Sequence, residues 1–205
     1  YKLVGPKVRF LNKRAFFQRE PNMKPTVSAA LFFPEAGVVS PYGLAIAYAE
    51  NAVDNGVMLS LDTAVLDMSV EDGRITRVVT NRGVIHPKVV INAAGVFSEE
   101  IARMAQDRFY SIHPRKGTNT ILDHKASTRM NTIVSTFGTS STKKRHTKGG
   151  GLVKTIDQNT LVGPDAVETN LKEDYSTSAE NIAYVFERQS ATDPALSMRD
   201  AITYF

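Results

Sequence analysis

The stretch that decides the fold class is Lys88-Val89-Val90-Ile91-Asn92-Ala93-Ala94-Gly95, which runs on to Ser98. Its centre, Val89-Val90-Ile91, is continuously apolar, and this predicts a short strand that is covered on both faces. The small residues Ala93-Ala94-Gly95 follow, and a helix is expected to begin at Ser98 with acidic residues in its first turn. A buried strand, small residues and a helix start together favour a backbone that approaches a phosphate or a cofactor.

The segment before this stretch predicts a helix followed by an antiparallel meander. Ser40-Pro41 is typical of a helix start, because the hydroxyl caps free N–H groups and proline suits the first turn. Asn55-Gly56 supplies the left-handed residue that ends such a helix. Alternating apolar residues predict a strand over 57–65, and turn signals on either side of 74–80 predict another strand there. Residues 40–106 therefore combine helix and sheet.

From residue 107 onward the pattern becomes that of an antiparallel sheet with one amphipathic helix. The helix is expected over 177–189, where Ile182, Val185 and Phe186 recur at helical spacing. The expected strands are 120–123, 130–134, 151–156 and 160–162. The fold class that these patterns predict is α+β.

Composition limits the chemistry that the chain can carry. Hydrophobic residues make up 42% and charged residues 22% of the 205 residues, as in an ordinary globular protein. The chain has no cysteine, which excludes disulfides, thiolate metal sites and catalytic thiols. Its four histidines lack the close spacing of paired metal ligands, so we expect no metal. No Gly-x-Ser-x-Gly string occurs, and hydrolase chemistry has no support.

The net charge of +4 admits an anionic ligand. The most basic run, Lys143-Lys144-Arg145-His146, is expected to be a solvated loop. A basic nucleic-acid-binding module that uses Lys143–Lys148 is an alternative of another class. A single basic cluster without a known binding motif argues against it, so no nucleic acid is expected as a partner.

Six short stretches, in their order along the chain, resemble one group of flavoproteins. They are Gln18-Arg19-Glu20-Pro21-Asn22, Gly37-Val38-Val39-Ser40-Pro41, Val90 to Ser98, His113-Pro114-Arg115-Lys116-Gly117, Thr160-Leu161-Val162-Gly163-Pro164 and Asp193-Pro194. Their order and spacing resemble the D-amino-acid-oxidase-like superfamily of FAD-dependent oxidoreductases. Within it, the nearest branch is that of FAD-dependent glycerol-3-phosphate dehydrogenase and L-2-hydroxyglutarate oxidase.

The resemblance implies part of an FAD-binding Rossmann-like domain joined to a mostly antiparallel-sheet substrate domain. Residues 1–39 are expected to be a substrate-domain segment, 40–106 part of the FAD-binding domain, and 107–205 the substrate (cap) domain. The family begins with a Gly-x-Gly-x-x-Gly turn and has a Gly-x-Arg motif near the flavin, and neither string occurs here. The chain is therefore expected to be an internal piece of the enzyme, inactive by itself.

The resemblance also implies contacts with the cofactor. Val65 would meet the adenine with its backbone, and the alternative is an ordinary core valine. Ala93, Ala94 and Gly95 would lie along the FAD pyrophosphate and ribitol, where larger side chains would hold the backbone away. A tight strand-to-helix turn is the alternative there. Gly163 would lie near the cavity, although a strand-ending turn explains this glycine equally well.

Substrate contacts are implied at Arg115, Lys116, Gly117 and Asn119. A guanidinium can grip a carboxylate or a phosphate with two hydrogen bonds, and a solvated basic turn is the alternative. Glycerol-3-phosphate dehydrogenases of the aerobic bacterial type tend to carry a histidine at the position of Asn119. This departure puts glycerol 3-phosphate in doubt, and it leaves the catalytic base unknown.

The implied function is hydride transfer from a small hydroxylated anionic substrate, glycerol 3-phosphate as first choice, to FAD. An L-2-hydroxyglutarate or amino-acid oxidase is the alternative among enzymes. Electrons would pass on to quinone or oxygen. The expected location is cytoplasmic, with peripheral membrane contact as a further expectation.

Overall fold

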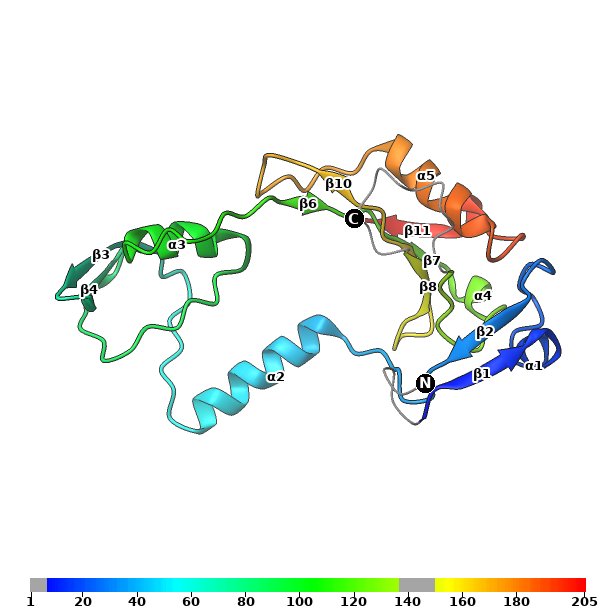
Figure 1. Cartoon of the computed structure of the whole chain (residues 1–205), viewed down its shortest axis with the longest axis horizontal. Helices are drawn as coiled ribbons and strands as arrows, with labels where there is room; N and C mark the ends of the chain where they lie inside the picture. The colour runs from blue at the N-terminus through cyan, green and yellow to red at the C-terminus, as the bar shows by residue number, and fades with distance from the viewer. Residues whose placement is uncertain (1–6, 137–149) are drawn as a thin grey trace. The chain divides into compact units, whose positions relative to one another are not determined.

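The computed structural model describes residues 7–136 and 150–205, and contacts between residues group the chain into two units (Figure 1). Unit 1 comprises Tyr1–Leu44, Lys116–Val167 and Tyr175–Phe205, and unit 2 comprises Ala45–Arg115 and Glu168–Asp174. The three-part division predicted from the sequence, at residues 39/40 and 106/107, stays a prediction about functional domains.

A four-stranded antiparallel sheet forms the centre of unit 1. Its strand order is β11 (Ala201–Tyr204), β7 (Thr120–Leu122), β9 (Thr160–Gly163) and β8 (Gly151–Lys154). Alternate residues of these strands point to one face, so Leu122, Leu152 and Val162 all enter the core and are almost fully buried. The strands predicted over 120–123, 151–156 and 160–162 are thereby confirmed.

Helix α5 (Ala179–Ser190) covers the core of this sheet and contacts β9. The hydroxyl of Ser178 accepts a hydrogen bond from the N–H of Asn181, which satisfies a free donor at the helix start. Ile182, Val185 and Phe186 are buried in the same cluster as the sheet residues. The helical spacing of these three residues predicted this packing.

The remainder of unit 1 is a strand pair with two short helices. β1 (Arg9–Asn12) pairs antiparallel with β2 (Ala29–Phe32), and α1 (Lys13–Arg19) lies between them in sequence. Phe16 of α1 is buried in the common core. The second helix is α4 (His124–Ser127), directly after β7.

The strand predicted over 130–134 is wrong. Only Val134 makes a bridge, to Leu152, with backbone N–O distances of 3.0 and 2.8 Å. Further back, the N–H of Asn131 donates to the carboxylate of Glu20 (3.0 Å), and the hydroxyl of Thr132 donates to the same group (2.6 Å). The backbone there is thus bonded to a side chain and not to a neighbouring strand.

Unit 2 contains the predicted meander. β3 (Val65–Glu71), β4 (Arg74–Thr80) and β5 (Gly83–Ile85) form an antiparallel three-stranded sheet in that order. The turn between the first two strands uses positive φ angles at Asp72 (49°) and Gly73 (72°), as the sequence indicates. The prediction of the meander is confirmed.

Three further elements complete the path of the chain. Helix α2 (Pro41–Asp54) begins as predicted, since the hydroxyl of Ser40 accepts from the N–H of Gly43 at 3.1 Å. The 3-10 helix η1 (Gly95–Phe97) leads into α3 (Ser98–Met104). Where the chain passes between the units, β6 (Arg115–Lys116) pairs with β10 (Val167–Glu168).

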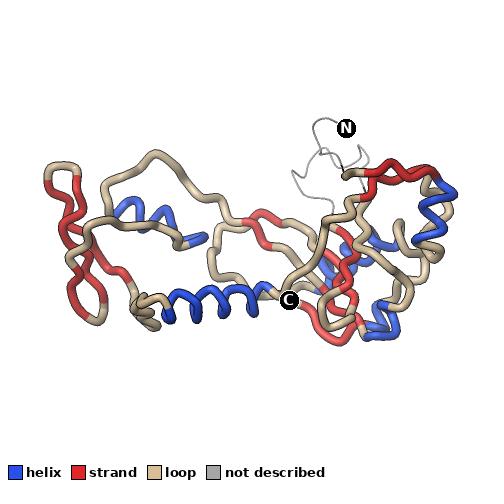
Figure 2. The backbone as a smooth tube through the Cα atoms, turned by 90° about the horizontal axis from the view of Figure 1, so that it is seen from below, coloured by secondary structure: helices blue, strands red, loops and turns tan. Residues whose placement is uncertain are grey.

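Two other predicted strands are wrong, those over 57–65 and 88–92. α2 leads through a loop into the meander, and the strand there starts only at Val65 (Figure 2). Residues 88–92 form no strand, and Val89 and Ile91 are 79% and 86% exposed. A strand requires a neighbour to pair its backbone groups, and no described segment lies in register with either stretch.

The basic run at 143–146, which was predicted to be a solvated loop, lies outside the described residues. Among the helices that the structure describes, none combines the length and the apolar character needed to cross a membrane.

Candidate functional site

The turn Ala93-Ala94-Gly95 in unit 2 has an open backbone. Gly95 has a φ of +56°, which a side-chain-bearing residue rarely adopts. No atom lies within 4 Å of the position that a Cβ on Gly95 would occupy. All three residues are exposed. The turn therefore combines a conformation that favours glycine with free space beside its backbone, and both features suit the close approach of a ligand.

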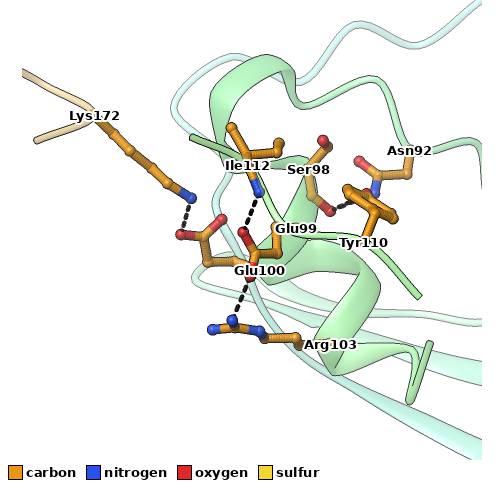
Figure 3. A network of polar contacts seen from close by, with 8 residues as sticks. All are labelled: Asn92, Ser98, Glu99, Glu100, Arg103, Tyr110, Ile112 and Lys172. Atoms are coloured by element: carbon orange, nitrogen blue, oxygen red, sulfur yellow. Dashed lines mark hydrogen bonds and ion pairs between the residues drawn. The ribbon is translucent and has the colours of Figure 1, made fainter. Parts of the chain in front are cut away.

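A small polar network ties the two ends of this turn together (Figure 3). The side-chain NH₂ of Asn92 donates to the carbonyl oxygen of Ser98 at 2.8 Å. The side-chain oxygen of Asn92 accepts from the N–H of Ala94 at 3.3 Å. The hydroxyl of Tyr110 donates to the same Ser98 carbonyl at 2.9 Å. One carbonyl is thus held by two donors from different segments.

The two acidic residues at the start of α3 each have a cationic partner (Figure 3). Glu99 is buried, pairs with Arg103, and accepts a hydrogen bond from the N–H of Ile112 at 2.7 Å. Glu100 pairs with Lys172, and the hydrogen bond from this ammonium holds the pKa of the Glu100 carboxyl below its usual value. These bonds fasten the segments around 112 and 172 to α3.

Val65 lies in the same unit as this turn. It is the first residue of β3, is partly buried, and has Thr80 as its cross-strand partner. Strand β3 contacts helix α3 (Figure 1). A backbone contact of Val65 with adenine stays a prediction.

The predicted substrate cations are held by polar groups of the chain. The guanidinium of Arg115 pairs with Glu168, with Nε and Oε1 3.0 Å apart. The ammonium of Lys116 donates to the carbonyl and the hydroxyl of Ser176, both at 2.9 Å. An anionic substrate at this place would share or replace these partners.

The turn Gly117-Thr118-Asn119 directly follows these cations in the sequence. It packs against Gly163-Pro164-Asp165 in unit 1. A Cβ on Gly163, whose φ is +136°, would lie 2.7 Å from the carbonyl oxygen of Thr118 and 2.9 Å from Oδ1 of Asn119. A Cβ on Gly117 would lie 3.1 Å from Cβ of Pro164. Close packing therefore explains why glycine occupies both positions, and a contact of either glycine with a ligand stays a prediction.

The buried carboxylate of Asp165 joins the two turns, and the sequence reasoning did not single it out. Its Oδ1 accepts a hydrogen bond from the N–H of Thr118 at 2.6 Å. Its Oδ2 is also buried and has no hydrogen-bond partner among the described residues. The signal in the sequence was the acidic residue directly after Gly163-Pro164.

The structure therefore gathers the predicted residues in two groups, each within its own unit. Val65 and Ala93–Gly95 belong to unit 2, as does Arg115, while Lys116, Gly117, Asn119 and Gly163 belong to unit 1. Among the residues that the structure describes, no cluster of three or more histidine, aspartate or glutamate side chains is arranged to hold a metal ion.

Comparison with known proteins gives the family. The profile of the DAO family, described as FAD dependent oxidoreductase, matches residues 1–204. The chain belongs to this family of FAD-dependent oxidoreductases. The resemblance seen in the six sequence stretches is thereby confirmed, and FAD is the cofactor that the family uses.

Individual proteins are also similar to this chain. A glycerol 3-phosphate dehydrogenase of Caloramator mitchellensis is 30% identical over 200 residues, which cover 98% of this chain and 40% of that enzyme. The L-α-glycerophosphate oxidase of Mycoplasma pneumoniae, solved with FAD bound, is 25% identical with a TM-score of 0.80, over 97% of this chain and 51% of that one. The chain thus spans about half the length of these relatives or less.

A further solved structure shares the fold. The L-proline dehydrogenase from P. horikoshii superposes on 99% of this chain and 52% of its own, with a TM-score of 0.83 at 21% identity. This likeness shows the fold alone. The predicted α+β class and its FAD-binding character are confirmed by these superpositions, whereas the individual site residues are not tested by them.

The residues of this chain fit FAD at the turn Ala93–Gly95. The free space beside Gly95 and the exposure of Ala93 and Ala94 leave the backbone of this turn accessible to a ligand, and its contact with FAD stays a prediction.

Proposed function

We propose that the protein of this chain is a flavin-dependent dehydrogenase that takes a hydride from glycerol 3-phosphate. The observation that carries the proposal is the 30% identity with a glycerol 3-phosphate dehydrogenase over 98% of the chain. The two cations Arg115 and Lys116, next to each other in sequence, support an anionic substrate.

In this proposal, FAD supplies the redox chemistry by accepting a hydride from the substrate carbon that bears the hydroxyl group. The backbone of Ala93, Ala94 and Gly95 would hold the pyrophosphate and ribitol portion, and the backbone of Val65 would contact the adenine. The protein would orient the substrate through Arg115 and Lys116, whose positive charges attract the negative charge of the phosphate. Gly117 and Asn119, the other two proposed substrate residues, lie in the turn that follows these cations.

We further infer that the electrons leave to quinone or to oxygen, and that the protein acts in the cytoplasm. Use of a quinone would bring the protein into peripheral contact with a membrane surface. Oxygen consumption by the protein, measured with and without added quinone, shows which of the two electron acceptors it uses.

Turnover of the protein as its gene encodes it tests the substrate. With a dye as electron acceptor, glycerol 3-phosphate is expected to be oxidised faster than L-2-hydroxyglutarate, glycine or proline. Activity with one of the other three and none with glycerol 3-phosphate would overturn the proposed substrate, and would favour an L-2-hydroxyglutarate or amino-acid oxidase.

A matched pair of variants tests the role of Arg115. Arg115→Gln removes the cation, whereas Glu168→Gln removes its partner in the chain and leaves the cation in place. We expect Arg115→Gln to raise the KM for glycerol 3-phosphate at least tenfold, and Glu168→Gln to leave it unchanged or lower it. Equal effects of the two changes would show that Arg115 serves only the ion pair.

A further inference from the structure

The side chain of Asn92 spans the turn that the proposed function assigns to FAD. Its two polar atoms bond to backbone groups on opposite sides of Gly95, namely the N–H of Ala94 and the carbonyl of Ser98 (Figure 3). A single planar amide thus links the entry of the turn to the first residue of α3. Fixing both ends limits the backbone angles that the residues between them can adopt.

Gly95 is the residue that gains most from this restraint. In a free chain a glycine samples many backbone conformations, and holding it at one of them is costly in entropy. Here its φ is +56°, and open space lies beside it. Backbone bonds hold this turn as well: the N–H of Phe97 donates to the carbonyl of Ala94 at 3.0 Å, and the N–H of Ser98 donates to the carbonyl of Gly95. The side chain of Asn92 adds two further bonds, one on each side of Gly95.

Tyr110 provides a natural comparison. Its hydroxyl donates to the same carbonyl of Ser98, at nearly the same distance as the amide of Asn92. Among the described residues, the hydroxyl of Tyr110 bonds to Ser98 and not to Ala93–Gly95, so it fastens the segment around 110 to α3. Its ring packs edge-on against Phe109. The two residues therefore share one acceptor but differ in whether they touch the turn.

From these contacts we propose that Asn92 is a positioning residue, which holds the backbone of Ala93–Gly95 in the conformation that receives the flavin nucleotide. The inference rests on the proposed function, because it takes this turn to be the FAD contact. Asn92 acts through the backbone of Ala94 and Ser98, and Tyr110 contributes to the stability of the same region without shaping the turn.

The test compares three variants of the protein as its gene encodes it, each stripped of flavin and titrated with FAD. Asn92→Ala removes both bonds, Asn92→Asp keeps the acceptor for Ala94 but replaces the donor to Ser98 with a repelling carboxylate, and Tyr110→Phe removes only the second donor. The dissociation constant of FAD is followed by quenching of flavin fluorescence. The unfolding temperature of each flavin-free protein is measured beside it.

We expect Asn92→Ala and Asn92→Asp to weaken FAD binding at least tenfold, and Tyr110→Phe to change it less than threefold. The unfolding temperatures of the flavin-free variants are expected to fall by similar amounts, because each loses a donor to Ser98. Conservation of FAD affinity in the asparagine variants, or an equal loss in Tyr110→Phe, would overturn the inference. If Asn92→Ala does not fold, the comparison of Asn92→Asp with Tyr110→Phe decides.

A different substrate would overturn the proposed substrate and leave the role of Asn92 untouched. Failure of the FAD assignment, on which both proposals rest, looks different. In that case the unaltered protein itself does not bind FAD, and both proposals are overturned together. If the unaltered protein binds FAD and the asparagine variants bind it equally well, the proposed function stands and only the role of Asn92 is refuted.

Discussion

The carboxylate of Asp165 accepts a hydrogen bond of 2.6 Å from the backbone N–H of Thr118, and the N–H of Asp165 donates back to the carbonyl of Thr118 at 3.4 Å. Both residues are buried, with exposures of 5% and 2%. This reciprocal pair joins the turn that precedes β7 to the turn that follows β9. The position of the predicted substrate residues in the first turn thus depends on an acidic side chain in the second.

Removal of this carboxylate is expected to destabilise the fold. Asp165→Ala leaves the buried N–H of Thr118 without an acceptor, and the expected loss is about 2 kcal/mol of the free energy of unfolding. Asp165→Asn keeps an acceptor for Thr118 and is expected to lose less. Chemical denaturation measures both, with Glu168→Ala at an exposed position as the control. Equal stability of Asp165→Ala and the unaltered protein would show that the pair contributes nothing.

Gly163 is expected to tolerate no side chain. Gly163→Ala would place a Cβ 2.7 Å from the carbonyl oxygen of Thr118, at a φ of +136°. Gly83 is the matched control, because its φ is +141° and its missing Cβ faces open space. Gly83→Ala carries the backbone strain alone, of order 1–3 kcal/mol, so Gly163→Ala should be clearly the less stable of the two. Thermal unfolding ranks them, and equal losses would contradict a steric role of Thr118.

Local signals explain what the sequence predicted correctly. The helix start at Ser40 and the turn at Asp72-Gly73 each depend on a hydroxyl or a glycine within a few residues. The helix predicted over 177–189 followed from the spacing of its own apolar residues. The strand predicted over 160–162 is likewise a local feature, and it lies in β9, whose residues are largely buried. Such features need no knowledge of distant segments.

The failures all involve partners that lie far away in the sequence. Asn131 was expected in a strand, but its N–H bonds to Glu20, 111 residues earlier. The apolar stretch at 88–92 has the composition of a strand, yet a strand also needs a neighbour, and none of the described segments pairs with it. Composition specifies what a segment prefers and does not supply its partner.

The candidate site follows the same rule. Ala93–Gly95 could be predicted because small residues before a helix form a local pattern. The hydrogen bonds of Asn92 and Tyr110 to the carbonyl of Ser98 could not, since they depend on how the chain folds around α3. The structural role of Asp165 could not be predicted from the sequence, because its partner Thr118 is 47 residues away.

Acid is expected to weaken the contact between Glu100 and Lys172. The pKa of Glu100 lies below its usual value of 4.5 in the folded protein, because the ammonium of Lys172 donates a hydrogen bond to its carboxylate. Above pH 4.5 the carboxyl is ionised in both states, and the contact stabilises the fold fully. As the pH falls below 4.5, the unfolded chain takes up the proton first, so this contribution shrinks and ends once the folded form is protonated as well.

The measurement is the difference in unfolding free energy between the unaltered protein and Glu100→Gln. This difference is expected to be present at pH 7 and to disappear well below pH 4.5, and Lys172→Met should show the same pH dependence. Glu71→Gln, a change at another exposed carboxyl of the same unit, serves as the control. A difference for Glu100→Gln that stays constant between pH 7 and pH 3 would refute the assignment of the lowered pKa to this contact.

The two-bonded ion pair of Arg129 and Asp193 is expected to be the most stabilising charge contact in unit 1. Nε and Nη2 of Arg129 donate to the two carboxylate oxygens of Asp193 at 3.0 and 2.6 Å, and the side chain of Asp193 is only 6% exposed. Arg129→Met leaves a buried carboxylate with less compensation, and the expected loss is about 3 kcal/mol of the free energy of unfolding. Arg129→Lys keeps the charge but loses the planar two-bond geometry, so its loss of stability should be intermediate.

Lys7→Met is the control. It breaks a pair with Glu35 in which both side chains are about two-thirds exposed, and it should change stability by less than about 1 kcal/mol. Denaturant titrations of the three variants at pH 7 give the order, and an Arg129→Met variant as stable as Lys7→Met would show that burial of Asp193 does not strengthen the contact.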